Sequence, residues 1–539
     1  MRKGTTNVTG RFNGQEFTHR TGGSVGSRRS AQLHSLGCGS GLCTRLVRHA
    51  FRNTRGVGQP RPHHGGARRT GGINGWPVCR ARRPSAGNIF KNLRCPRCDR
   101  QMSGIWHTDD VHLTSAGADF GNCIHAKPSV VVVPRTVADV QEALRYTAAR
   151  NLSLAVRGSG HSTYGQCQAD GGVVLDMKRF NTVHDVRSGQ ATIDAGVRWS
   201  DVVAATLSRQ QTPPVLTDYL GTTVGGTLSV GGFGGSSHGF GLQTDNVDSL
   251  AVVTGSGDFR ECSAVSNSEL FDAVRGGLGQ FGVIVNATIR LTAAHESVRQ
   301  YKLQYSNLGV FLGDQLRAMS NRLFDHVQGR IRVDADGHLR YRLDLAKYFT
   351  PPRRPDDDAL LSSLQYDSCA EYNSDVDYGD FINRMADQEL DLRHTGEWFY
   401  PHPWASLLIP ADKIEQFIET TSSSLTDDLG NSGLIMVYPI PTTPITAPFI
   451  PIPHCDTFFM LAVLRTASPG AEARMIASNR LLYEQARDVG GVAYAVNAVP
   501  MSPGDWCTHF GSRWQAIARA KRRFDPYRIL APGYRMSFD

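Results

Sequence analysis

Long apolar stretches are missing from this 539-residue sequence, and none approaches the roughly 18 residues that a helix needs to cross a bilayer. No charged start is followed by a clean apolar segment, so a secretory signal is poorly supported. The 11 cysteines have no regular spacing, and no disulfide framework is legible from them. Hydrophobic residues make up 40% and charged residues 20% of the chain. We therefore expect a soluble globular protein without a membrane partner, in the cytoplasm.

Acidic residues are almost absent from residues 1–98, which contain 19 Lys or Arg and one acid, Glu16. This segment is rich in Gly, Arg and Ser without apolar periodicity, so we expect it to be disordered. The formal net charge of +9 belongs to it, and the rest of the chain is acidic. A transit sequence, a basic tail for a polyanion and a start codon placed too early all remain open. A nucleic-acid-binding protein is an alternative function, although we expect no nucleic acid on the folded part.

One cysteine pair invites a metal hypothesis. Cys95 and Cys98 form a C-x-x-C, and Cys123 with His125 could complete a zinc site. Such pairs are common by chance, and this one lies in an irregular basic segment. We therefore expect no metal site.

From about Asp119 the sequence alternates predicted strands and helices. Residues 128–134, PSVVVVP, are a β-branched run between prolines, which is typical of a buried strand. Thr136 can cap a following helix with an apolar stripe. Further strands are predicted in residues 152–158, 171–177 and 281–292, a strand, turn and helix in 191–207, and a hairpin turning on 255–258. Longer polar segments from about residue 296 predict a second domain.

Two glycine-rich stretches favour a ligand close to the backbone. The turn GSGHS, residues 158–162, follows a predicted strand, where backbone N–H groups can face a pyrophosphate. It lacks the G-x-G-x-x-G spacing and no long helix follows, so the Rossmann interpretation fails. Residues 221–241, GTTVGGTLSVGGFGGSSHGFG, lie between predicted strands, which argues against a flexible linker. Taken alone, either stretch can be purely structural.

Several segments occur together in the order seen in the vanillyl-alcohol-oxidase superfamily of FAD enzymes, including VRGSGHSTYGQ, LTDYLGTTVGGTLSVGG and RRFDPYRILAPG. Within it, T-D-Y-L with T-V-G-G-T-L, G-G-L-G-Q-F-G and PHPWASLLIP resemble the cytokinin dehydrogenases, over roughly residues 110–539. The resemblance implies an α+β, two-domain PCMH-type fold. Its FAD-binding domain would comprise residues 99–295 and 490–539, on either side of an antiparallel-sheet substrate domain at 296–489.

The resemblance also implies roles for individual residues. His161 would bond covalently to the flavin of FAD, since neutral imidazole is a nucleophile, although it could only hydrogen-bond in the turn. Asp218 would accept a proton from the substrate amine as hydride leaves for the flavin, although it could equally be a turn residue. Trp404 would be an aromatic wall of the substrate pocket. The other expected cofactor-binding residues are Arg157, Gly158, Ser159, Gly160, Ser162, Gln166, Thr217, Tyr219, Thr223, Gly226, Ser229, Gly232, Ser236, His238, Gly239, Val283, Ile284 and Tyr534.

Two positions depart from the family pattern. Tyr534 stands where these enzymes often have glutamine, and Gln328 stands where plant members tend to have a glutamate that helps to hold the purine. Gln328 can still form hydrogen bonds but has no charge. The implied reaction is oxidation of a secondary allylic amine of the isopentenyladenine type to adenine and an aldehyde, with oxygen or a quinone as acceptor. An alcohol, alditol or oligosaccharide oxidase of the same fold is the alternative.

Overall fold

The computed structural model describes residues 104–334, 336–367, 373–426, 429–430, 433–468 and 470–538. The predicted disordered extension, residues 1–98, lies outside the described residues, as do Cys95 and Cys98. Within the described residues, the first elements are β1 Ile105–His107 and α1 Asp110–Ala116. The expected start near Asp119 was therefore too late, because these two short elements carry no strong periodic signal.

A four-stranded sheet follows the predicted local patterns closely. Its strand order is β1, β2 Val130–Val133, β4 Val173–Asp176 and β3 Leu154–Arg157, with β2, β4 and β3 parallel. All four valines of β2 are buried, as expected for a strand covered on both faces. The helix α2 Val137–Ala149 begins at Thr136, whose side chain forms a capping box with Asp139. Both the buried strand and the capped helix are confirmed.

A five-stranded antiparallel sheet comes next along the chain. Its order is β5 Val183–Arg187, β6 Gln190–Asp194, β10 Gly282–Arg290, β8 Val247–Thr254 and β9 Phe259–Ser263. The hairpin between β8 and β9 turns on residues 255–258, as predicted. Around this sheet lie α3 Trp199–Leu207, α4 Val224–Leu228 and α6 Ser268–Val274, whereas α5 Ser237–Phe240 lies against β17 Leu434–Pro441. A two-stranded pair, β7 Gln211–Thr212 and β11 Thr292–Ala293, leads towards the next domain.

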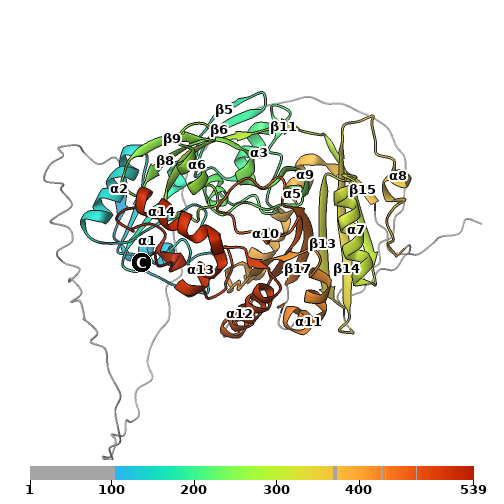
Figure 1. Cartoon of the computed structure of the whole chain (residues 1–539). Coiled ribbons are helices and arrows are strands. Elements are labelled where there is room, and N and C mark those ends of the chain that lie inside the picture. Colours follow the sequence, from blue (N-terminus) through green and yellow to red (C-terminus); the bar gives the residue numbers. More distant parts are fainter. Residues whose placement is uncertain are drawn as a thin grey trace, which may run out of the picture. The chain divides into compact units, whose positions relative to one another are not determined.

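The second domain is built on an eight-stranded antiparallel sheet (Figure 1). Its order is β15 Asn373–Asp377, β12 Ser297–Tyr305, β14 Leu339–Phe349, β13 His326–Val333, β17 Leu434–Pro441, β18 Thr457–Leu464, β16 Ala405–Pro410 and β19 Val492–Ala493. Its apolar core includes residues of α7 Leu308–Ser320, α11 Ile414–Thr426 and α12 Glu472–Asp488. The short helices α8 Asp357–Leu361, α9 Tyr378–Ile382 and α10 Met385–Thr395 connect strands. The α+β class with an antiparallel second sheet is as expected.

The C-terminal segment returns to the first sheet. After α13 Pro503–Phe510 and α14 Trp514–Phe524, Leu530 forms a parallel bridge to Leu154 of β3. Ile529 and Leu530 are buried in the same apolar cluster as β2, β3 and β4. The strand β19 lies beyond residue 489 but belongs to the large sheet. Among the described helices, none combines the length and apolar character that a membrane span requires.

Candidate functional site

The turn of residues 158–162 presents bare backbone. Within the described residues, none of the N–H groups from Gly158 to Thr163 donates a hydrogen bond to another protein group. The carbonyl groups are used instead, since those of Gly160 and Ser162 accept from the N–H groups of Phe120 (2.8 Å) and Gly121 (2.9 Å). Backbone N–H groups need partners when they are enclosed. A run of them without protein partners suits an anionic pyrophosphate.

The side chains of Asp119 and Arg157 hold the turn of residues 158–162 in position through hydrogen bonds. The buried Asp119 carboxylate accepts hydrogen bonds from the Ser162 hydroxyl (2.8 Å) and the Gly165 N–H (2.7 Å). Burial raises the pKa of Asp119, although these donors oppose the rise. Arg157, the last residue of β3, donates to the carbonyl of Ala118 at 2.6 Å. A Cβ atom added to Gly160 would lie only 2.4 Å from a guanidinium nitrogen of Arg157, so this side chain fills the space beside the glycine.

His161 lies in a cluster of aromatic rings. Its ring centroid is 4.1 Å from that of Phe120, 4.7 Å from Tyr219 and 5.9 Å from Trp404. Burial lowers the pKa of His161 to about 3, and the neighbouring His402 contributes further. The imidazole is therefore neutral at physiological pH. The cluster brings together three residues that the sequence suggested from separate segments.

Asp218, next to Tyr219, is held by two side chains of the second domain. Gln328 on β13 donates its Nε2 to Asp218 Oδ2 at 2.8 Å, and Arg384 forms an ion pair with Oδ1. Burial, the largest influence, acts to raise the pKa of Asp218. The positive charge of Arg384 and the hydrogen bond from Gln328 outweigh it, so the pKa lies below its ordinary value. A half-buried, ionised carboxylate in this position can act as a base.

A cavity of about 440 Å³, within the volume range of typical ligand sites, is lined by Tyr164, Gln166, Arg480 of α12 and residues of the C-terminal segment. Gln166 and Tyr534, both expected to bind the cofactor, line it together. Gln166 donates its Nε2 to the backbone carbonyl of Asn497 at 2.9 Å. The side chain of Asn497 in turn bonds both the N–H (2.6 Å) and the carbonyl (2.8 Å) of Ser406. The cavity wall is thus tied to β16 of the large sheet.

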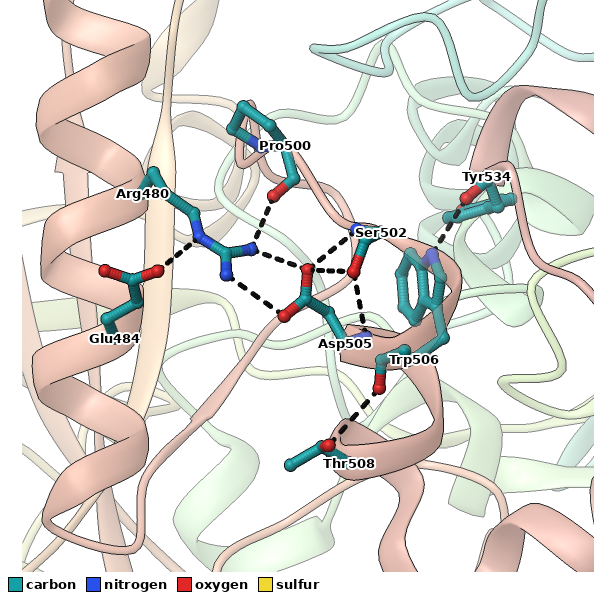
Figure 2. A network of polar contacts seen from close by, with 9 residues as sticks. Arg480, Glu484, Pro500, Ser502, Asp505, Trp506, Thr508 and Tyr534 are labelled. Atoms are coloured by element: carbon teal, nitrogen blue, oxygen red, sulfur yellow. Dashed lines mark hydrogen bonds and ion pairs between the residues drawn. The ribbon is translucent and has the colours of Figure 1, made fainter. Parts of the chain in front are cut away.

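One wall of this cavity is an ordered polar network (Figure 2). Arg480 on α12 binds Asp505 through both terminal nitrogens, at 2.7 and 3.0 Å, and also donates to the carbonyl of Pro500. These bonds from Arg480 hold the pKa of Asp505 below its ordinary value. The Trp506 indole donates to the backbone carbonyl of Tyr534 at 2.9 Å. The network keeps the position of Tyr534 fixed relative to α12 and α13.

The glycine-rich stretch, residues 221–241, lies against the 158–162 turn. A Cβ atom added to Gly158 would come within 2.0 Å of the Thr223 hydroxyl, so only glycine fits there. The N–H of Gly232 donates to the Tyr494 hydroxyl at 3.4 Å, and Tyr494 also lines the cavity. Two other expected residues lie in and directly after α4, namely Gly226 and Ser229.

None of the remaining expected cofactor-binding residues lines the 440 Å³ cavity. The His238 ring lies between the carbonyl oxygens of Gly235 (3.0 Å) and Phe324 (3.1 Å), so both of its nitrogens already contact protein. Val283 and Ile284 are buried within β10 in the apolar core. Ser159 and Gly239 are exposed, whereas Thr217 and Ser236 line a second cavity of about 30 Å³ together with Arg384.

Potential metal ligands gather in two places in the described part of the chain. One group is His107, Asp109 and His112, and the other is Asp334, Asp336 and His338. Neither includes the proposed zinc ligands. The Cys123 thiol donates instead to the Gly121 carbonyl, and His125 contacts the side chain of Asn122.

Sequence reasoning missed several residues of the site, above all Asp119 and Arg384. In the sequence, Asp119 marked only the approximate start of the predicted strands and helices and carried no chemical signal of its own. Arg384 stands 166 positions from Asp218 at the start of a polar helix without buried residues. A pairing of this kind leaves no local signal in one sequence. Charge alone would not have selected Arg384 among the arginines of the second domain.

The donor set fits FAD, because the free N–H groups of the turn suit its phosphates and the adjoining cavity is large enough for a ring system. Comparisons with known families agree with this geometry. A family model described as "FAD binding domain" matches residues 128–263, which include both glycine-rich stretches. A second, described as "Cytokinin dehydrogenase 1, FAD and cytokinin binding", matches residues 331–537. The protein is an FAD-dependent oxidoreductase with a PCMH-type FAD-binding fold.

Curated relatives define the family. The chain is 33% identical over 496 residues to cytokinin dehydrogenase 1 of Arabidopsis thaliana, across 83% of this chain and 84% of the relative. It is 34% identical over 500 residues to cytokinin dehydrogenase 4 of Oryza sativa subsp. japonica, across 84% and 93% of the two chains. The chain belongs to the cytokinin dehydrogenase family, which confirms the resemblance found in the sequence.

Proposed function

We propose that the protein oxidises the secondary allylic amine of an isopentenyladenine-type cytokinin. The observation that carries this proposal is the carboxylate of Asp218, which is 21% exposed and is held between Arg384 and Gln328. The names of the relatives, which are cytokinin dehydrogenases, support the same substrate class. We further propose oxygen or a quinone as the electron acceptor and the cytoplasm as the location.

Asp218 supplies the base of the reaction. Its ionised carboxylate accepts the proton of the substrate N–H, which makes loss of hydride from the neighbouring carbon easier. FAD, when bound, supplies the acceptor for that hydride. Loss of a proton and a hydride leaves an imine, and water cleaves it to adenine and an aldehyde. Trp404, in the cluster beside His161, offers an aromatic surface to a flat or unsaturated substrate.

The chain offers separate groups for holding the cofactor. The N–H groups of residues 158–162 would bind its phosphates, and Gln166 and Tyr534 would line its ring system. His161 is the proposed point of covalent attachment. Because its imidazole is neutral, it keeps a lone pair that can act as a nucleophile.

A second candidate is an alcohol, alditol or oligosaccharide oxidase, in which Asp218 would deprotonate a hydroxyl group. The uncharged Gln328 favours this candidate, because the glutamate that helps plant members to hold a purine is missing. Incubating the FAD-loaded protein with isopentenyladenine or with sorbitol separates the two. We expect adenine and aldehyde in equal amounts from the first and no turnover of the second. Turnover of sorbitol alone would overturn the proposal.

A further inference from the structure

Arg384 meets Asp218 at the junction of α9 and α10. One of its terminal nitrogens pairs with Asp218 Oδ1, and the other donates to the Phe381 carbonyl at 3.1 Å. Its guanidinium also lies 4.9 Å from the centroid of the Phe381 ring. The side chain is therefore anchored to Phe381 of α9 and has a defined direction towards the carboxylate.

Asp218 also faces ionisable groups on the large sheet. On β13, burial lowers the pKa of His326 to about 3, so this imidazole is neutral. Arg330, on the same strand, already pairs with Asp344 at 2.7 Å. Asp344 also pairs with Arg342 at 2.7 Å, so one carboxylate of β14 is shared by two arginines, and the charge of Arg330 adds to the influences that lower the pKa of Asp218.

Two tyrosines complete the surroundings of the carboxylate. Tyr348 on β14 and Tyr438 on β17 both interact electrostatically with Asp218. Burial raises the pKa of each hydroxyl well above its ordinary value, so both stay protonated and uncharged. Among the described cations that act on Asp218, Arg384 forms the direct ion pair and has the larger influence, and Arg330 has a smaller one.

Building on the proposed function, we infer that Arg384 is a positioning residue that keeps Asp218 ionised and holds its Oδ1, while Gln328 holds Oδ2. A carboxylate has about four lone-pair positions, so two bonds leave capacity for a substrate N–H. Because the charge of Asp218 is already balanced, a protonated amine gains little by entering and must still lose its hydration. The site therefore selects substrates whose reacting nitrogen is neutral, such as the exocyclic amine of a purine.

The test compares three variants of the full-length, FAD-loaded protein. Arg384→Met removes the positive charge. Arg384→Lys keeps the charge but lacks the planar guanidinium group, and Arg290→Met is the control. Arg290 forms an exposed ion pair with Asp248 on the five-stranded sheet. Two readouts are recorded for each: the pH profile of kcat/KM with isopentenyladenine, and an infrared titration of the Asp218 carboxyl band, assigned by its loss in Asp218→Asn.

We expect Arg384→Met to move both the carboxyl titration and the acidic limb of kcat/KM upward by about 1–3 pH units. Activity then falls first at low pH and recovers at higher pH, and added guanidinium partly restores it. Arg384→Lys should shift both less, and Arg290→Met neither. A uniform loss of activity at every pH with an unmoved carboxyl titration would overturn the inference. If wild type oxidises no cytokinin, the proposed function fails, and the infrared titration still decides the role of Arg384.

Discussion

The side-chain amide of Gln328 donates to the carboxylate of Asp218 at 2.8 Å, although the two residues are 110 positions apart. This bond joins β13 of the large sheet to the loop that carries the proposed base. The base is therefore oriented by the domain that we propose to bind the substrate. Gln328 is fully buried, and its own Oε1 has no hydrogen-bond partner among the described residues. Such an acceptor is costly to leave unpaired.

Replacing Asp218 by Asn removes the base and keeps the shape of the side chain. We expect kcat to fall by about 10²–10⁴-fold, the usual contribution of a positioned general base. Flavin content should stay close to wild type. Stopped-flow measurement of flavin reduction checks this, and a change of less than about threefold would be incompatible with a base at this position.

Replacing Gln328 by Glu places a second carboxylate beside Asp218. A like charge disfavours ionisation, so the pKa of Asp218 should rise. The ionised form of Asp218 is the active one. The pH at which activity is lost on acidification should therefore rise by about one unit or more. Gln416→Glu, on the exposed face of α11, is the matched control. An acidic limb of kcat/KM that is the same in both variants would refute the coupling.

Local patterns predicted the first domain well. The β2 strand, the capped helix α2 and the hairpin of β8 and β9 depend mainly on residues close in sequence, such as Thr136 and Asp139. The site depends on distant partners. Asp119 holds the 158–162 turn from more than 40 positions away, and Arg384 reaches Asp218 across 166. Pairings of this kind depend on how distant segments pack together, which periodicity does not encode.

Replacing His161 by Ala tests the covalent link. Wild type should give a yellow acid precipitate and a His161 peptide that carries the mass of the flavin. In His161→Ala all FAD should appear in the supernatant, because no other attachment is proposed. A colourless wild-type precipitate with free FAD would refute covalent attachment, while leaving the cofactor assignment intact.

A buried ion pair holds the C-terminal segment in place. Lys521 and Asp525 are 3% and 0% exposed and lie 2.9 Å apart, and Asp525 also accepts from the N–H groups of Ile529 and Leu530. Lys521→Met leaves a buried charge without a partner and should destabilise the protein by about 3–5 kcal/mol. Arg523→Met on the same helix breaks an exposed pair and should cost about 0–1 kcal/mol. Denaturant unfolding checks both, and equal losses would contradict the proposed difference.

The central claim is that this chain transfers hydride from a cytokinin to its own FAD. Anaerobic mixing of the FAD-loaded protein with isopentenyladenine tests it most directly, with the visible flavin absorption as readout. We predict bleaching of the flavin band with release of adenine, and little bleaching in Asp218→Asn. A flavin band that stays unchanged with isopentenyladenine but bleaches with sorbitol would contradict the account.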